Sequence, residues 1–183
     1  ANLAEEGILE IGGNALLARA GALYHDLGKM KNPQFFIENQ STGINPHDEL
    51  SFEESAEIII EHVKNGITIA KANNLPDELI DFIRTHHGTS MVQYFYKQYV
   101  ASFPDELEAG EKFTYPGPKP FSRETAALMM ADAVEAAARS LKQPTAEIID
   151  HLVENIINKQ IDEEQFVNAD ITLKAITQIK KLF

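Results

Sequence analysis

The sequence predicts an all-α domain that spans residues 1–183. Apolar residues recur at spacings of three and four along most of the chain, which is the pattern of amphipathic helices. Apart from a short stretch around Val100 and Phe103, no segment alternates between apolar and polar residues as a half-buried strand does. A length of 183 residues and a hydrophobic fraction of 44% suit one domain with a sizeable core. We therefore expect one bundle of helices without an internal repeat.

Several start signals place these helices along the chain. Ser51 and Glu54 form a capping box ahead of an apolar run. Ser122, Thr145 and Asp170 are expected N-caps, because a short side chain with an oxygen can accept a hydrogen bond from a free backbone N–H group. Together with these signals, the periodicity predicts helices at about 1–11, 14–26, 52–63, 65–73, 76–87, 89–101, 122–141, 145–159 and 171–182.

Two long segments rich in proline and glycine, residues 27–51 and 102–121, interrupt the predicted helices. Long loops inside a compact domain are usually functional or disordered. The first loop follows a His-Asp pair, and the second precedes an aspartate in an apolar helix. We therefore expect both loops to line or cover a site.

The composition excludes several classes of protein. A net charge of −12 and a pI of about 4.9 disfavour long nucleic acids, whose phosphates require clustered Lys and Arg. The absence of cysteine excludes disulfides and thiolate metal sites. The chain has no run of about 18 apolar residues, which a membrane span requires, and shows no signal peptide. A small phosphate ligand held by metal ions is compatible with such a surface.

Histidines and aspartates interrupt the apolar faces of the predicted helices. Each histidine precedes a glycine (Gly28, Gly66 or Gly88), so we expect each near a helix C-terminus, where the helix dipole favours cations. Burying such groups is unfavourable unless they are paired or metal-bound. Nitrogen and oxygen ligands suit Mn, Fe, Zn, Co or Ni, and two ions sharing a carboxylate activate water against a phosphate ester. The set consists of His25, Asp26, His62, His86, His87 and Asp132.

These residues also have simpler interpretations. A single histidine near a helix end is often a packed or capping residue, and Asp132 also fits an exposed helical stripe. His47-Asp48 is a second His-Asp dipeptide, but it lies in loop sequence without an apolar face. We expect a solvated loop there. The alternative is that this pair contacts the substrate from the loop. His151 is expected at the surface of its helix.

The order His-Asp, His, His-His, Asp, with Gly28-Lys29 after the first pair, resembles the HD-domain metal-dependent phosphohydrolases. Longer segments resemble the cytoplasmic HD domain of seven-transmembrane HD receptors, a group that hydrolyses cyclic di-AMP to the linear dinucleotide. The similarity extends over nearly the whole chain. The segments are YHDLGKMKNPQFFIENQ (24–40), INPHDELS (44–51), THHGTSMVQYFY (85–96), YPGPKP (115–120) and MMADAVEAAARSL (129–141).

The resemblance implies a binuclear metal centre in which Asp26 bridges the two ions. One ion takes His25, Asp132 and a further histidine that the family carries upstream of its His-Asp pair. The other ion takes His62, His86 and His87. No histidine precedes Tyr24, and the chain begins without Met in helical sequence. We therefore expect an N-terminally truncated piece of a longer protein, whose parent is anchored at the cytoplasmic face of the membrane.

Asp26 and Lys29 are the expected catalytic residues, since Lys29 follows Asp26 by one turn and can neutralise a phosphate oxygen. The simpler interpretation of Lys29 is a solvated lysine without a catalytic role. Aromatic rings can stack on adenine, which contributes about 1–3 kcal/mol per base, although the aromatic run 94–96 must place at least one ring in the core. The expected substrate contacts are Lys29, Tyr96, Tyr115, Lys119 and Arg139.

The sequence thus predicts an all-α HD-domain phosphodiesterase with two divalent transition metal ions. Mn or Fe are expected first, with Zn, Co or Ni as alternatives. The predicted reaction opens cyclic di-AMP to the linear dinucleotide by attack of a hydroxide that bridges the ions. The alternatives are an HD nucleotidase, a phosphodiesterase for another nucleotide, or a signalling module that binds a nucleotide without turnover.

Overall fold

The computed structural model describes residues 1–40, 43, 45–104 and 107–183, and within these ranges it contains helices and no β-sheet. Residues 41–42, 44 and 105–106 belong to the two expected loops and lie outside the described residues. The all-α prediction is confirmed. The α-helices are α1 (Asn2–Ile11), α2 (Ala15–Tyr24), α3 (Phe52–Ala72), α4 (Asp77–Thr85), α5 (Gln93–Ser102), α6 (Arg123–Ala138), α7 (Ala146–Asp162) and α8 (Leu173–Leu182).

Short 3-10 helices replace much of the two predicted loops. The described part of the first loop folds into four of them, and the second loop contains one. The prediction of structureless loops was therefore wrong for these stretches. The predicted helix at 89–101 also begins later, because Met91 pairs with Thr114 in an isolated β-bridge before α5 starts. The 3-10 helices are η1 (Leu27–Lys31), η2 (Pro33–Phe35), η3 (Ile37–Asn39), η4 (Pro46–Glu49) and η5 (Leu107–Phe113).

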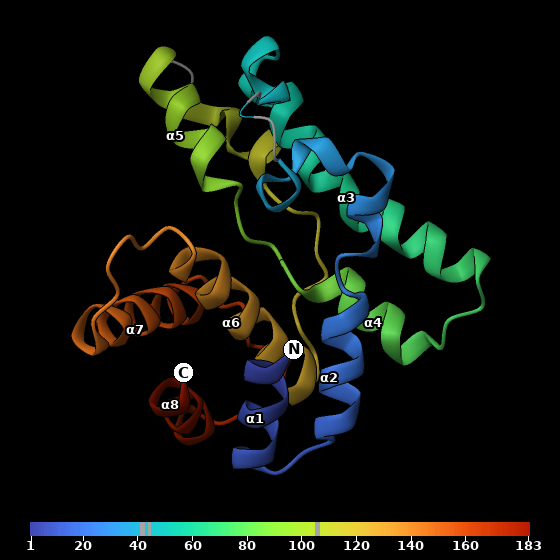
Figure 1. The fold of residues 1–183 in the computed structure, drawn as a ribbon, viewed down its shortest axis with the longest axis vertical. Coiled ribbons are helices and arrows are strands. Elements are labelled where there is room, and N and C mark those ends of the chain that lie inside the picture. The colour runs from blue at the N-terminus through green and yellow to red at the C-terminus, as the bar shows by residue number, and fades with distance from the viewer. Residues whose placement is uncertain (41–42, 44, 105–106) are drawn as a thin grey trace.

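The helices pack around several apolar clusters. In Figure 1 the upper half of the molecule contains α3 and α5, the lower half contains α1, α2, α6, α7 and α8, and α4 lies between the two halves. The main cluster joins α1, α6, α7 and α8 through buried residues such as Met130, Ile157 and Ile179. A smaller cluster around Tyr99 and Phe113 joins α3, α5 and η5 in the upper half of Figure 1. None of the described helices combines the length and the hydropathy that crossing a membrane requires.

Helix α3 is one continuous helix, whereas the sequence predicted two helices that meet near residue 64. Gly66 does not end a helix. It faces Gly28 where η1 crosses α3, and almost no space separates the two backbones there. A Cβ atom on Gly28 would lie 1.7 Å from the His62 carbonyl oxygen and 2.5 Å from the Gly66 nitrogen. His62 therefore lies in the middle of α3, and its expected position near a helix C-terminus was wrong. His25 and His86 do cap the C-termini of α2 and α4.

The predicted N-caps are confirmed with one exception. Ser51 forms the capping box with Glu54, and Ser122 and Thr145 accept hydrogen bonds from backbone N–H groups at the starts of α6 and α7. Asp170 does not cap α8. The cap is a threonine two residues later, while the Asp170 carboxylate pairs with Arg123 at 2.8 Å.

Candidate metal centre

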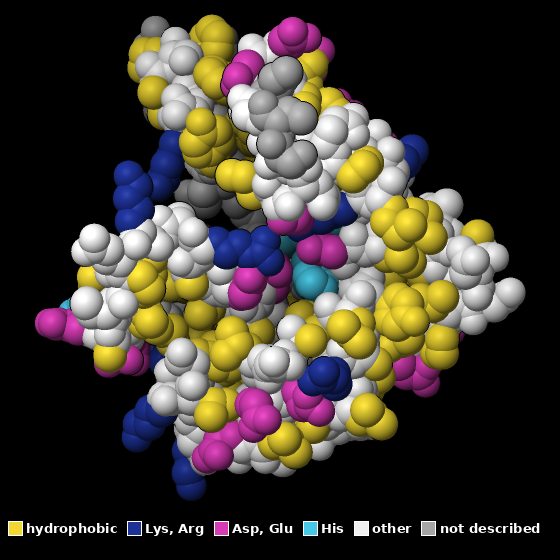
Figure 2. All heavy atoms as spheres, viewed as in Figure 1, with side chains coloured by type: hydrophobic (Ala, Val, Ile, Leu, Met, Phe, Trp, Pro, Cys, Tyr) yellow, Lys and Arg dark blue, Asp and Glu magenta, His cyan; other side chains and the backbone are white. Residues whose placement is uncertain are grey.

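The structure brings all six predicted ligand residues to one point between the two halves of the molecule. They come from the C-terminal ends of α2 and α4, from the middle of α3 and from α6. Figure 2 shows a hollow near the middle of the visible face, with histidine atoms inside and both acidic and basic side chains around it. The six residues are His25, Asp26, His62, His86, His87 and Asp132.

Three of the imidazole rings are oriented by the same hydrogen bond. In His25, His62 and His86, the Nδ1–H group donates to the backbone carbonyl three residues earlier in the same helix. Because a carbonyl oxygen only accepts, this bond places a proton on Nδ1, so that Nε2 has a lone pair whenever the ring is neutral. Histidines that bind metals are commonly oriented by such a bond on the other ring nitrogen.

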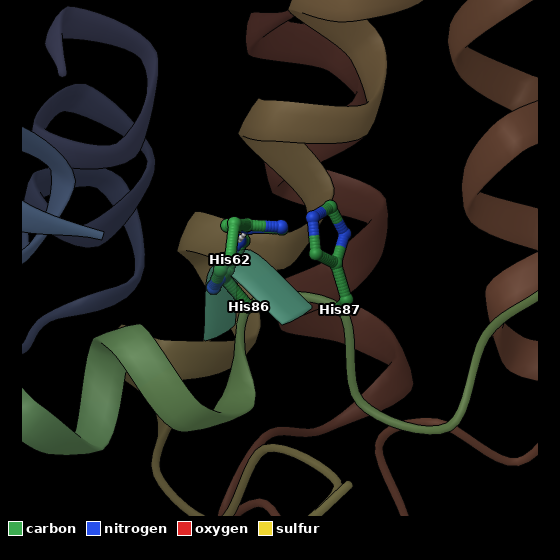
Figure 3. Close-up of side chains that lie close together, drawn as sticks. All are labelled: His62, His86 and His87. Atoms are coloured by element: carbon green, nitrogen blue, oxygen red, sulfur yellow. Dashed lines mark hydrogen bonds between the residues drawn. The ribbon is translucent and has the colours of Figure 1, made fainter. Parts of the chain in front are cut away.

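The free nitrogens then face one another. His62 Nε2 and His86 Nε2 are 3.1 Å apart, and Asp26 Oδ1 lies 3.5 Å from the first and 3.7 Å from the second. His87 completes this set, since the three histidines offer nitrogen atoms within 4.8 Å of one another (Figure 3). Buried acceptors at such distances repel unless a cation lies between them. The three-histidine set, His62, His86 and His87, therefore fits a metal ion.

A second set lies on the other side of Asp26. Asp26 Oδ2 and Asp132 Oδ1 each lie 3.3 Å from His25 Nε2. The two oxygens of Asp26 thus face different groups: Oδ1 faces the three-histidine set and Oδ2 faces His25. A carboxylate in this position can bind two ions at once, which is the arrangement the resemblance implied.

The two sets differ in their protonation before metal binds. Burial opposes the charged form of His25, but hydrogen bonds to Asp132 and Asp26 and their negative charges outweigh it and raise the pKa of His25 to about 10. Burial and the neighbouring imidazoles lower the pKa of His86 to about 3. Burial also lowers the pKa of His62 and of His87. The three-histidine set is therefore neutral at pH 7, whereas His25 carries a proton.

We expect metal uptake to show this difference. An ion that binds His25 must displace its proton, so its affinity should fall about tenfold for each unit by which the pH drops below about 10, a range that includes pH 6 to pH 8. An ion in the three-histidine set displaces no proton in this range, and its affinity should stay flat. Calorimetric Mn²⁺ titrations between pH 6 and pH 8 would check this. Two binding events with the same pH dependence would contradict it.

A cavity of about 730 Å³ opens beside the second set, lined by His25, Asp26 and Asp132 together with Lys29 and Arg139. Candidate metal ligands and two cations thus line the cavity, together with further polar side chains such as Glu38 and Glu135 and apolar side chains from α1, η3 and α6. The structure therefore brings the predicted Lys29 and Arg139 to the same pocket as the candidate ligands.

Each cation in the pocket is held by a carboxylate that the sequence analysis missed. Lys29 Nζ lies 2.8 Å from Asp26 Oδ2 and 2.6 Å from Glu38 Oε1. Arg139 Nε donates to Glu135 Oε1 at 2.6 Å. Glu135 follows Asp132 by three residues on α6, so helical spacing could have identified it. Glu38 lies on a 3-10 helix that the sequence did not predict, and no local signal marks it.

The other three predicted substrate contacts do not line this pocket. Tyr96 packs against Phe113, with ring centroids 5.6 Å apart, in the cluster between α3 and α5. Lys119 donates to a backbone carbonyl of the residue that follows α7, at 3.4 Å. Tyr115 is buried, and its ring stacks on His87 at 4.2 Å between centroids. Its role in this structure is to support a candidate ligand.

His47 is half-buried rather than solvated, so the expectation of a solvated loop was wrong for this residue. Its Nε2–H group donates to the Phe35 carbonyl at 2.9 Å, and its ring contacts Phe35 and Phe95 at centroid distances of 5.1 Å and 4.9 Å. His47 thus joins η2 and η4 to α5, and it belongs neither to the two ligand sets nor to the lining of the cavity. His151 is exposed on α7, as expected.

The chain matches a known domain family, and it matches two curated relatives over nearly its whole length. The model of the HD domain family matches residues 1–137. The cyclic-di-AMP phosphodiesterase PgpH of Bacillus subtilis is 46% identical over 181 residues, covering 99% of this chain and 25% of that protein. The protein of the same name from Listeria monocytogenes is 44% identical over 180 residues, covering 98% of this chain and 25% of that protein. The chain thus spans about a quarter of the length of these curated relatives.

Solved structures show the same fold. The crystal structure of the L. monocytogenes phosphodiesterase PgpH HD domain in complex with cyclic-di-AMP has a TM-score of 0.94 to this chain at 42% identity. The match covers 98% of this chain and 83% of that one. A second crystal structure of that HD domain matches with a TM-score of 0.91.

Proposed function

This chain belongs to the HD domain family, and we propose on that premise that its metal centre hydrolyses cyclic di-AMP to the linear dinucleotide. The observation that carries the proposal is the placement of Asp26 between the three-histidine set and the pair His25 and Asp132, beside a cavity that Lys29 and Arg139 also line. The names of the PgpH relatives and the complex of the Listeria HD domain with cyclic-di-AMP supply the substrate.

The donor set suits two divalent transition metal ions, with Mn or Fe ahead of Zn, Co or Ni, because it offers imidazole nitrogens and carboxylate oxygens but no thiolate. Such ions supply an activated water and neutralise negative charge on the phosphate. His62, His86 and His87 would hold one ion, and His25 and Asp132 the other. Asp26 would bind both.

Two cations prepare the pocket for a dianionic substrate. Asp26 and Glu38 raise the pKa of Lys29 despite its burial, so the ammonium stays charged beside the metal centre. Arg139 lies in the same pocket and is more exposed than Lys29, which lets its guanidinium exchange Glu135 for a phosphate. We propose that Lys29 neutralises the phosphate that reacts and that Arg139 contacts the second phosphate.

We further propose that residues 1–183 form the catalytic domain of a longer, membrane-anchored protein and act on the cytoplasmic face. The length of the curated relatives, four times that of the matched segment, supports a longer protein. The membrane anchor and the cytoplasmic face rest on the resemblance to the seven-transmembrane HD receptors. The resemblance places a further histidine ligand upstream of the His25-Asp26 pair. A test of activity should therefore use a longer form of the protein that includes that histidine.

Such a longer form, supplied with Mn²⁺, is expected to cleave cyclic di-AMP faster than cyclic di-GMP and far faster than long single-stranded RNA. The surface with net charge −12 repels a polymer, whose binding depends on many phosphate contacts, whereas a dinucleotide needs only the metal centre and two cations. Initial rates on the three substrates and on a mononucleotide would check this. Faster turnover of cyclic di-GMP or of the mononucleotide would overturn the substrate assignment, and binding without turnover would favour a signalling module.

A further inference from the structure

His87 differs from the other candidate histidine ligands in how its ring is oriented. The rings of His25, His62 and His86 each donate a hydrogen bond to their own helix. Across the described ranges, the ring of His87 makes no hydrogen bond. It is held only by packing against other rings, at centroid distances of 4.2 Å from Tyr115, 4.0 Å from His86 and 5.2 Å from His62. The position of His87 Nδ1 and Nε2 therefore depends on the backbone that carries them. That backbone is the turn after α4, residues 86–90 (Figure 3).

A side chain from a distant part of the chain holds this turn. Two bonds close the turn internally, from the Gly88 nitrogen to the Thr85 carbonyl at 2.9 Å and from the Ser90 nitrogen to the His87 carbonyl at 3.0 Å. The Thr89 nitrogen has no such internal partner and donates to Gln165 Oε1 at 3.0 Å. The amide group of the same glutamine donates back to Thr89 Oγ1 at 3.2 Å.

Gln165 is itself tightly fixed. Its side chain is almost completely buried, with 1% of the residue exposed. Helix α7 ends just before it in a Schellman-type turn, in which the Gln165 nitrogen donates to the Gln160 carbonyl at 2.9 Å. Glu164 occupies the left-handed position of that turn with φ of 55°, a conformation that usually requires glycine. The end of α7 therefore directs Gln165 inward at a local cost in backbone energy.

The contact between Gln165 and the turn leaves no free space at Gly88. A Cβ atom on Gly88 would lie 2.3 Å from Gln165 Oε1, so the amide packs directly on the backbone of the turn. Gly88 also has φ of 51°, which lets the chain reverse immediately after His87. Gln165 therefore limits how far the residues after His87 can move toward α7, and its bond to the Thr89 nitrogen holds them there.

We propose that Gln165 is a positioning residue for the metal centre, which sets the affinity of the three-histidine set by fixing the turn that carries His87. This inference rests on the proposed function, because it requires that the set binds an ion. Gln165 lies beyond residues 1–137, the part that matches the HD domain model. The C-terminal helices thus contribute to the centre without supplying a ligand.

The test compares Gln165→Met with Gln160→Met in Co²⁺ titrations. Gln160 is also buried, but its amide donates to the Met129 carbonyl on α6 and does not contact the turn. We expect Gln165→Met to weaken the first Co²⁺ equivalent roughly 10- to 100-fold, the usual effect of losing an outer hydrogen bond at a metal site. The visible absorption bands of bound Co²⁺ should also shift, because the geometry of the ligands changes. Gln160→Met should lower the melting temperature while leaving affinity and spectrum unchanged.

Thr89→Val provides a milder second variant, since it removes the hydroxyl partner and keeps the bond from the Thr89 nitrogen. It should weaken Co²⁺ binding by less than Gln165→Met does. Equal Co²⁺ affinity and an unchanged spectrum in Gln165→Met would overturn the inference, as would equal losses in both glutamine variants. If the unmutated protein binds no Co²⁺, the metal centre itself fails and the inference fails with it.

Discussion

Asp26→Ala is expected to abolish turnover of cyclic di-AMP in a form of the protein that carries the upstream histidine. Both ions lose a ligand, because the two oxygens of Asp26 face His25 on one side and the three-histidine set on the other. A metal ion stabilises the transition state by several kcal/mol. Losing about 4 kcal/mol of this stabilisation lowers the rate roughly a thousandfold. Rate measurements at saturating Mn²⁺ and metal analysis would check this.

Asp48→Ala is the matched control, since it removes the aspartate of the second His-Asp pair. Asp48 is exposed and accepts a hydrogen bond from Asn45 at 3.0 Å, and it belongs neither to the two ligand sets nor to the lining of the cavity. The rate and the metal content of this variant should equal those of the unmutated protein. A comparable loss of metal in both variants would mean that His25-Asp26 is not the metal-binding pair.

Gly28→Ala is expected to damage both the fold and the metal centre. The new Cβ atom would lie 1.7 Å from the His62 carbonyl oxygen, so η1 must move away from α3. Backbone atoms cannot give way as a flexible side chain does, and we expect a loss at or above the upper end of the roughly 1–3 kcal/mol that overpacking costs. Because Asp26 precedes η1 directly, the movement also separates Asp26 from His62. Urea unfolding and Mn²⁺ titration would measure the two effects.

Gly110→Ala is the matched control for this variant. A Cβ atom on Gly110 would meet only Met91 Cε, at 3.6 Å, which is an ordinary contact. We expect unchanged Mn²⁺ affinity and a change in the free energy of unfolding below about 0.5 kcal/mol, as is usual for a substitution that disturbs no special feature. If Gly28→Ala behaves in the same way, the close crossing of η1 and α3 does not support the site.

Sequence patterns marked the histidines and Asp132 because they continue or interrupt apolar helical faces, and the resemblance to the HD-domain phosphohydrolases joined them with Asp26 into one predicted set. His86 extends the buried face of α4 that includes Ile83, and Asp132 interrupts the apolar sequence of α6. Burying a polar residue on an apolar helical face costs free energy unless a hydrogen-bond partner or an ion contacts it, and this holds for any tertiary arrangement. The fold class followed for a similar reason, since helical periodicity is a local property.

Other features depend on contacts between residues far apart in the sequence and have no local signature. A glycine after a histidine indicates either a helix end or a close backbone crossing, and Gly66 proved to be the second. His47 lies in polar loop sequence, yet it packs between Phe35 and Phe95, which are distant from each other along the chain. The contact of Gln165 with Thr89 joins residues 76 positions apart.

The most direct test of the binuclear centre is a crystal structure with Mn²⁺ and cyclic di-AMP, with anomalous scattering used to locate the ions. We expect two anomalous peaks. One should lie among His62, His86 and His87, the other between His25 and Asp132, with one oxygen of Asp26 bound to each and a phosphate of the dinucleotide beside them. Peaks at other residues, or a dinucleotide bound away from His25, Asp26 and Lys29, would contradict the proposed metal-dependent phosphodiesterase.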